Sequence, residues 1–113
     1  MKIINAAISA TELKEKHSNF FDSMIKAVVD IEKEIIAVDA ELHADLEEIL
    51  IQQGSKQENL WGFNIYPDKK EEEIIEYTSL INIRPHQGNK GMEIKNEDIR
   101  SKIKNISKQL IQI

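Results

Sequence analysis

The side chains best suited to chemistry lie along two predicted neighbouring strands, over residues 60–66 and 74–84. Side chains alternate between the faces of a strand, so one face of this hairpin would carry a row of polar groups. The row consists of Asn64, Tyr66, Glu76, Thr78, Asn82 and Arg84, with His86 just beyond it. A guanidinium binds phosphate or carboxylate through a planar fork, and an imidazole exchanges protons near neutral pH. The row therefore predicts a site for an anionic ligand.

The candidate ligand-binding residues are Asn64, Tyr66, Glu76, Asn82, Arg84 and His86. The alternative is the ordinary polar outer face of an antiparallel sheet, which needs no ligand. Leu80 stands in the middle of the row. An apolar residue there indicates that part of this face is covered.

Other short patterns predict neither a metal nor a cofactor. His43 and Glu47 are four residues apart on a predicted helix, a spacing that can serve one metal ion, but no second histidine accompanies them. The loop Gly88-Asn89-Lys90-Gly91 offers backbone amides to an anion but matches neither nucleotide-binding fingerprint. There are no cysteines, which excludes disulfides, thiol catalysis and Cys-ligated metals.

Charge is distributed unevenly along the chain. The net charge is −5, yet residues 29–83 carry four lysines against fourteen acids, and residues 84–113 carry seven basic groups against three acids. Arg100, Lys104 and Lys108 follow one another at helical spacing. Such a stripe suits a nucleic-acid backbone, but aromatic residues are not interleaved with it and the pI is about 5.2. A solubilising face is the favoured interpretation, and nucleic acid is an unlikely partner.

Hydropathy predicts a cytoplasmic protein that does not enter a membrane. The first residues lack the long apolar segment of a signal peptide. The longest apolar run, 35–38, is far shorter than the roughly 20 residues of a membrane span.

Periodicity and capping residues predict seven elements. Ser9 and Glu12 fit a capping box that starts a first helix, with an apolar stripe of Leu13, Phe20, Phe21 and Met24. Segments 28–31 and 35–38 are β-branched and predict a hairpin. A second helix is expected over 40–53, capped by Asp39, closed by Gly54 and buried through Leu42, Leu46, Ile49 and Leu50.

The second half of the chain is also expected to form two strands followed by a helix. On strands 60–66 and 74–84, one face is apolar and is expected to lie in the core, through Trp61, Phe63, Ile65, Ile75, Tyr77, Ile81 and Ile83. Asn96 caps a final helix with an apolar stripe that begins at Ile99. The order αββαββα predicts one compact α+β domain over residues 1–113, with a mostly antiparallel four-stranded sheet built from two hairpins and covered by helices.

Several long strings resemble a family of small uncharacterised prokaryotic proteins, a domain of unknown function. The strings are VVDIEK (28–33), ELHAD (41–45), GSKQENLWGFNIYP (54–67), INIRP (81–85) and QGN (87–89). The resemblance covers roughly residues 24–100 and implies a compact intracellular protein without assigning an activity. It also implies glycine-rich turns near positions 34 and 39, where this chain has Glu34 and Asp39-Ala40.

Two functions follow as hypotheses. The first is a small non-catalytic binding or interaction protein, with a homodimer as one form, because the chain shows no nucleophile–base pair, metal set or cofactor motif. The second is an enzyme acting on a phosphorylated or nucleic-acid substrate. In it Arg84 would hold the anion, His86 or Glu76 would exchange a proton, and Asn64 and Asn82 would orient the substrate.

Overall fold

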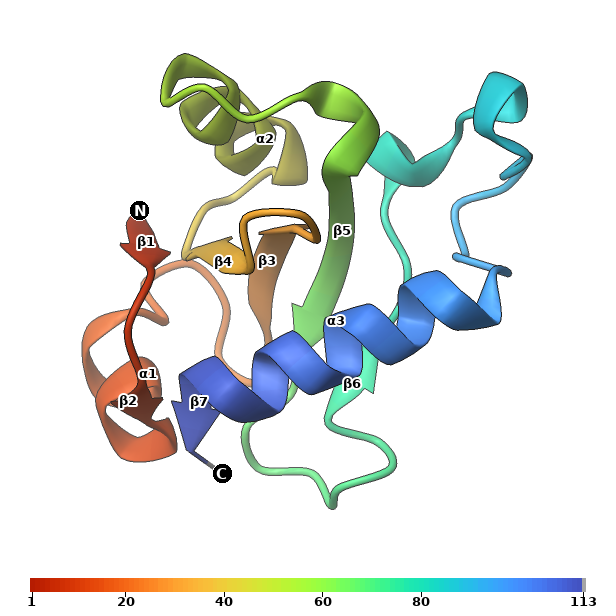
Figure 1. Cartoon of the computed structure of the whole chain (residues 1–113). Helices are drawn as coiled ribbons and strands as arrows, with labels where there is room; N and C mark the ends of the chain where they lie inside the picture. The colour runs from red at the N-terminus through yellow and green to blue at the C-terminus, as the bar shows by residue number, and fades with distance from the viewer. Residues whose placement is uncertain (113) are drawn as a thin grey trace.

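A five-stranded antiparallel sheet with helices on both faces forms the centre of the protein (Figure 1). The structure is a computed structural model and describes residues 1–112. In spatial order, the strands are β1 (Lys2–Ile4), β4 (Ile35–Val38), β3 (Ile25–Asp30), β5 (Leu60–Ile65) and β6 (Ile75–Glu76). The helices are α1 (Ala10–Lys16), α2 (His43–Gln52), α3 (Glu97–Leu110) and the 3₁₀ turns η1 (Gln57–Asn59), η2 (Leu80–Asn82) and η3 (Pro85–Gln87). The predicted α+β class is confirmed, with one strand more than expected.

Each face of the sheet has its own core, because the central strands are apolar on both sides. Trp61 and Phe63 of β5 pack with Ile103 and Ile106 of α3 on one face, where Leu13 of α1 also lies. On the other face, α2 packs Leu46 and Leu50 against Val28, Ala37 and Leu60. The central residues 27–29 of β3 are apolar and buried without a break, which is typical of a sheet that is covered on both sides.

A short parallel pair joins the two ends of the chain. β2 (Ile8–Ser9) pairs with β7 (Ile111–Gln112), immediately before α1 and immediately after α3. Ile111 is 1% exposed. The pair therefore anchors the C-terminal end of α3 beside α1.

The predicted caps of the first and last helices are present. The Ser9 hydroxyl accepts a hydrogen bond from the Glu12 amide at 3.0 Å, and the Asn96 side chain accepts one from the Ile99 amide at 3.0 Å. Gly54 follows α2 with φ +99°, the left-handed conformation expected of a helix-closing glycine. The hairpin of β3 and β4 is also confirmed, with β3 starting three residues earlier than predicted.

The first helix is shorter than predicted. α1 ends at Lys16, and the Ser18 hydroxyl then bonds back to the Lys14 carbonyl. Phe20 is 51% exposed, so the apolar stripe expected to run to Met24 was wrong beyond Leu13. Ser and Asn compete with helical hydrogen bonds through their side chains, and Ser18-Asn19 stands where the helix stops.

The second helix starts later than predicted because its expected cap has another role. The Asp39 carboxylate accepts hydrogen bonds from the Asn19 backbone amide at 2.8 Å and from the Asn19 side chain at 2.5 Å. α2 therefore begins at His43 with Leu42 as its N-cap, which leaves Leu42 54% exposed instead of buried. Glu34 and Asp39 both adopt positive φ, at 57° and 73°. The two positions where the resemblance implied glycine thus keep a turn conformation that favours glycine.

The predicted strand 74–84 is mostly not a strand. Only Ile75–Glu76 pairs with β5, after which Ser79 caps the turn η2 by accepting a hydrogen bond from the Ile81 amide. Beside Gly62, the Asn82 side chain takes the place of a strand. Its Oδ1 accepts from the Gly62 amide at 2.8 Å, and its Nδ2 donates to the Gly62 carbonyl at 2.9 Å. Leu80, expected to be covered, is 70% exposed, and Ile83 is 44% exposed.

Candidate functional site

The predicted polar row divides into two separate groups. Asn64, Tyr66 and Glu76 lie together at the β5–β6 pairing, whereas Arg84 is the N-cap of η3 and His86 lies within η3. The division follows from the end of β6 at Glu76, because residues beyond that point no longer alternate along a strand. Asn82 belongs to neither group, since its side chain is fully buried and bonds the backbone of Gly62.

The first group is centred on one oxygen of Glu76. Its Oε1 accepts hydrogen bonds from Asn64 Nδ2 at 2.8 Å and from the Tyr66 hydroxyl at 3.0 Å. Partial burial and the neighbouring carboxylate raise the pKa of Tyr66 above its ordinary value. The Asn64 Oδ1 atom is buried without a hydrogen-bond partner among the described residues. These side chains can orient one another but leave little to offer a phosphate.

His43 lies close to this group, at the start of α2. Its Nε2 is 2.9 Å from the Phe63 carbonyl oxygen, to which a neutral imidazole donates. Burial lowers the pKa of His43, the Phe63 contact opposes this effect, and the nearby charge of Lys26 lowers it further. His43 therefore fixes α2 to β5 as a neutral ring. Across residues 1–112, no three His, Asp or Glu side chains are grouped as a metal ion would need.

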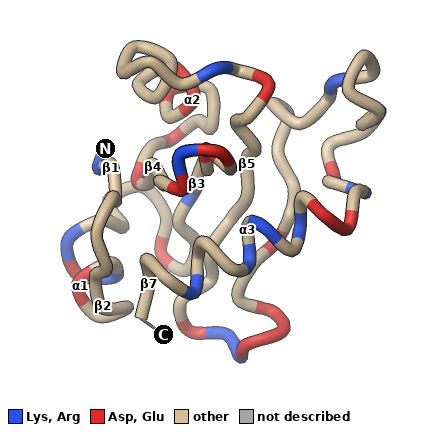
Figure 2. Tube along the Cα trace, viewed as in Figure 1, with Lys and Arg blue, Asp and Glu red and all other residues tan. Residues whose placement is uncertain are grey.

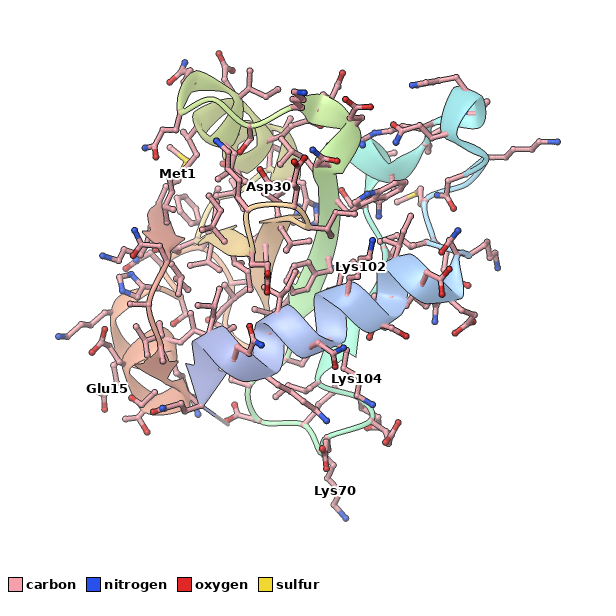
Figure 3. The ribbon with its side chains drawn as sticks, in the orientation of Figure 1. Met1, Glu15, Asp30, Lys70, Lys102 and Lys104 are labelled. Atoms are coloured by element: carbon pink, nitrogen blue, oxygen red, sulfur yellow. The ribbon has the colours of Figure 1, made fainter. Side chains whose placement is uncertain are left out.

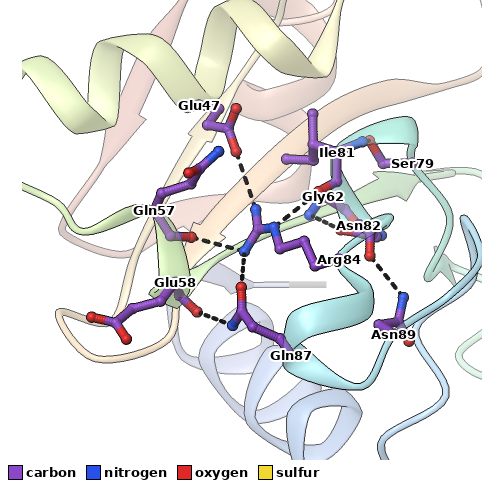
Figure 4. A network of polar contacts seen from close by, with 10 residues as sticks. All are labelled: Glu47, Gln57, Glu58, Gly62, Ser79, Ile81, Asn82, Arg84, Gln87 and Asn89. Carbon is purple, nitrogen blue, oxygen red and sulfur yellow. Dashed lines mark hydrogen bonds and ion pairs between the residues drawn. The ribbon is translucent and has the colours of Figure 1, made fainter.

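Arg84 is the centre of the second group and is almost completely buried, with 5% of its side chain exposed. Its NH2 group is 3.1 Å from a Glu47 carboxylate oxygen, and its Nε donates to the Ile81 carbonyl at 3.1 Å. Its NH1 group donates to the Gln57 carbonyl at 2.8 Å and faces the Gln87 side-chain oxygen at 3.4 Å (Figure 4). The guanidinium thus joins α2, η1, η2 and η3.

We call Arg84 and the four groups that its guanidinium faces, on Glu47, Gln57, Ile81 and Gln87, the Arg84 clamp. Further contacts hold it in place. Its guanidinium carbon lies 4.9 Å from the centre of the Trp61 ring, a stacked cation–π arrangement. Burial lowers the pKa of Arg84, whereas Glu47 acts in the opposite direction. The chain then turns through Gly88, at φ +83°, so that Asn89 pairs with the Arg84 backbone. Asn89 holds the turn by donating from Nδ2 to the Asn82 carbonyl at 2.9 Å.

A shallow hollow of about 280 Å³ opens beside this clamp. Its lining residues come from α2, η1, η2 and η3: Glu47, Gln57, Leu80, Ile81, Ile83, Arg84 and His86. Of the six predicted site residues, only Arg84 and His86 reach it. Leu80 and Ile83 are its exposed apolar members.

Sequence reasoning identified Arg84 but missed its partners. Glu47 is 37 residues away and was considered only for a metal, while two acceptors are backbone carbonyls of Gln57 and Ile81. Every residue has a backbone carbonyl, so the residue type does not indicate which carbonyl will accept a hydrogen bond. The one available clue was that the acidic α2 and Arg84 carry opposite charge.

Comparisons with known proteins identify a family without an assigned function. A family model described as "Protein of unknown function (DUF5674)" matches residues 2–110. No curated protein and no solved structure matches the chain. Within the described residues, no helix has the length and apolar content needed to cross a membrane.

Proposed function

The chain belongs to this family of proteins of unknown function, and we propose that it is a non-catalytic binding protein that holds a short segment of a partner polypeptide in the hollow beside Arg84. The observation that supports the proposal is the engagement of Arg84 within the chain. Its guanidinium faces four acceptors of the protein itself, including Glu47. A substrate phosphate would have to displace Glu47 from a buried ion pair, which is costly.

Two exposed apolar side chains border the hollow. Leu80 is 70% exposed and Ile83 is 44% exposed, and both border the same concavity as His86. Exposed apolar side chains at a rigid concave surface are typical of the centre of a protein interface. The Arg84 clamp fixes η2 and η3 in advance, so binding would cost less ordering entropy than binding to a flexible loop.

Charge favours a basic partner. Glu47 of the hollow is already paired with Arg84, so the negative charge open to a partner lies beside it, at the exposed Glu48 of α2 and Glu58 of η1. A segment with one large apolar residue beside lysine or arginine would place its apolar group against Leu80 and Ile83 and its charge near these acids. Complementary charge speeds association and selects among partners.

A displayed library of random peptides, selected on the purified protein, tests the proposal. We expect enrichment of peptides that combine a large apolar residue with a neighbouring Lys or Arg, and Leu80→Asp should weaken their binding at least about tenfold. Met92→Asp is the matched control, because Met92 is 41% exposed but does not line the hollow. Absence of saturable peptide binding, or equal binding by Leu80→Asp, would overturn the proposal.

A homodimer is the alternative occupant of the same surface. Light scattering of the wild-type chain at high concentration distinguishes it: a dimer that Leu80→Asp converts to a monomer would assign the hollow to a second copy. The enzyme hypothesis has less support from the geometry, because Glu76, Asn64 and Asn82 do not share a cavity with Arg84 and His86.

A further inference from the structure

A larger cavity, about 630 Å³, lies between α3 and the segment that contains β6. Its apolar lining includes Ile74, Ile75, Tyr77 and Ile111, and Arg100, Lys104 and Lys108 of α3 form a basic wall. Glu71 and Glu72, from the loop between β5 and β6, also line the cavity. Figure 2 shows the acidic stretch of this loop in red, below α3. The volume is within the usual range of about 300–1,000 Å³ for small-molecule sites.

The first sign of a missing partner is Ser107. Its residue is 3% exposed and lines the cavity, yet its hydroxyl has no hydrogen-bond partner among the described residues. The hydroxyl of a serine inside a helix usually either faces solvent or bonds the carbonyl four residues earlier. A buried hydroxyl without a partner destabilises the free protein, so a ligand that supplies an acceptor would relieve this cost.

The second sign is the uneven pairing of the three cations. Arg100 lies 3.1 Å from Glu93, and Lys108 lies 3.6 Å from Glu71. Lys104 has no ion pair within residues 1–112 and is only half-buried. Because Lys104 and Ser107 are three residues apart on one helix, they present a cation and a hydroxyl donor on the same face.

We propose that this cavity binds a small carboxylic acid with an apolar body. One carboxylate oxygen would accept from Lys104 Nζ and the other from the Ser107 hydroxyl, while the body packs on Ile74, Ile75 and Ile111. The cavity suits a monoanion better than a phosphate ester, because within residues 1–112 only Lys104 of its three cations lacks an ion pair, and because Ile74, Ile75 and Ile111 offer an apolar surface for the body of the ligand.

Octanoate is the probe, with octanol and octylamine as uncharged and cationic analogues of the same chain length. We expect saturable octanoate binding by calorimetry, with amide NMR shifts concentrated in α3, β6 and β7, and much weaker binding of both analogues. Lys104→Met should weaken octanoate binding about tenfold. Lys102→Met is the matched control, since Lys102 is exposed on α3 and does not line the cavity (Figure 3).

Ser107→Ala separates a binding role from a purely structural one. Without the buried hydroxyl, the free protein should melt about 4 °C higher, while octanoate should bind more weakly than to the wild type. The proposal is overturned if octanoate does not bind to the folded protein, if octylamine binds equally well, or if Lys104→Met and Lys102→Met behave alike. A lower melting temperature for Ser107→Ala with unchanged binding would likewise contradict it.

Discussion

Arg84 and Lys104 are both basic side chains that line a concave surface, and the protein treats them in opposite ways. Arg84 is 5% exposed and faces four acceptors from four different segments. Lys104 stands on α3, half-buried, beside the buried hydroxyl of Ser107, and neither group has a partner among residues 1–112. A charge can be buried only where acceptors surround it, so the better satisfied cation is the less available to a ligand. The contrast indicates that a ligand site is better sought where a charged or polar side chain still lacks a hydrogen-bond or ion-pair partner within the protein.

Neutralising each cation is the strongest test of this contrast. Arg84→Met leaves Glu47 without its partner and removes the link between α2 and the turns, so unfolding should become easier by about 3–5 kcal/mol. Lys104→Met should change stability by less than about 0.5 kcal/mol, since Lys104 is only half-buried and has no ion pair within residues 1–112 to lose. Urea unfolding of both variants measures the difference. Equal effects would mean that the Arg84 contacts contribute no more than a surface charge.

Close packing beside the Arg84 turn should also contribute to stability, in addition to the hydrogen bonds of Arg84. A Cβ on Gly62 would lie 2.6 Å from Ser79 Cβ, so Gly62→Ala should destabilise the protein by about 1–3 kcal/mol. Ser79→Gly removes the obstructing atom, and the double variant Gly62→Ala/Ser79→Gly should lose less stability than the two single losses added together. Thermal unfolding of the three variants forms a double-mutant cycle. Simple additivity would show that the close approach is not the cause.

The smallest expected effect concerns pH, and it acts on the α2 side of the sheet. The pKa of His43 is lower in the folded protein than in the unfolded chain, so the unfolded chain binds more protons as the pH falls below about 6.5. His43 therefore makes stability decrease as the pH falls through this range, until the folded ring itself is protonated. His43→Gln should flatten the dependence of urea stability on pH between 7.5 and 5.5. An unchanged slope would exclude His43 as its source.

The sequence predicted correctly those helices and strands whose ends are set by nearby residues, such as a capping side chain or a glycine. Ser9 and Asn96 cap helices as expected, Gly54 closes one, and the β-branched runs around residues 32–34 form a hairpin. The failures come from side chains that found distant partners. Asp39 bonds Asn19 instead of capping α2, and Asn82 bonds Gly62 instead of continuing a strand.

The site was harder to predict than the fold for the same reason. Alternation placed Arg84 on a polar face, but its position depends on Glu47 and on the Gln57 carbonyl, 37 and 27 residues away. The cavity beside Ser107 had even less signal, because a single serine inside an amphipathic helix looks ordinary in sequence. That the Ser107 hydroxyl lacks a hydrogen-bond partner among the described residues becomes visible only when β6 and its loop are placed beside α3.

The side chain of Asn82 also has a consequence for association between molecules. An edge strand exposes backbone groups to which another chain can add as a further strand, and such addition leads to aggregation. β5 runs past the end of β6, yet the carboxamide of Asn82 occupies the donor and the acceptor of Gly62. The single buried residue Asn82 thus closes the part of β5 that lies beyond β6, and strand addition is left to the short outer edges of β6, with two residues, and of β1, with three.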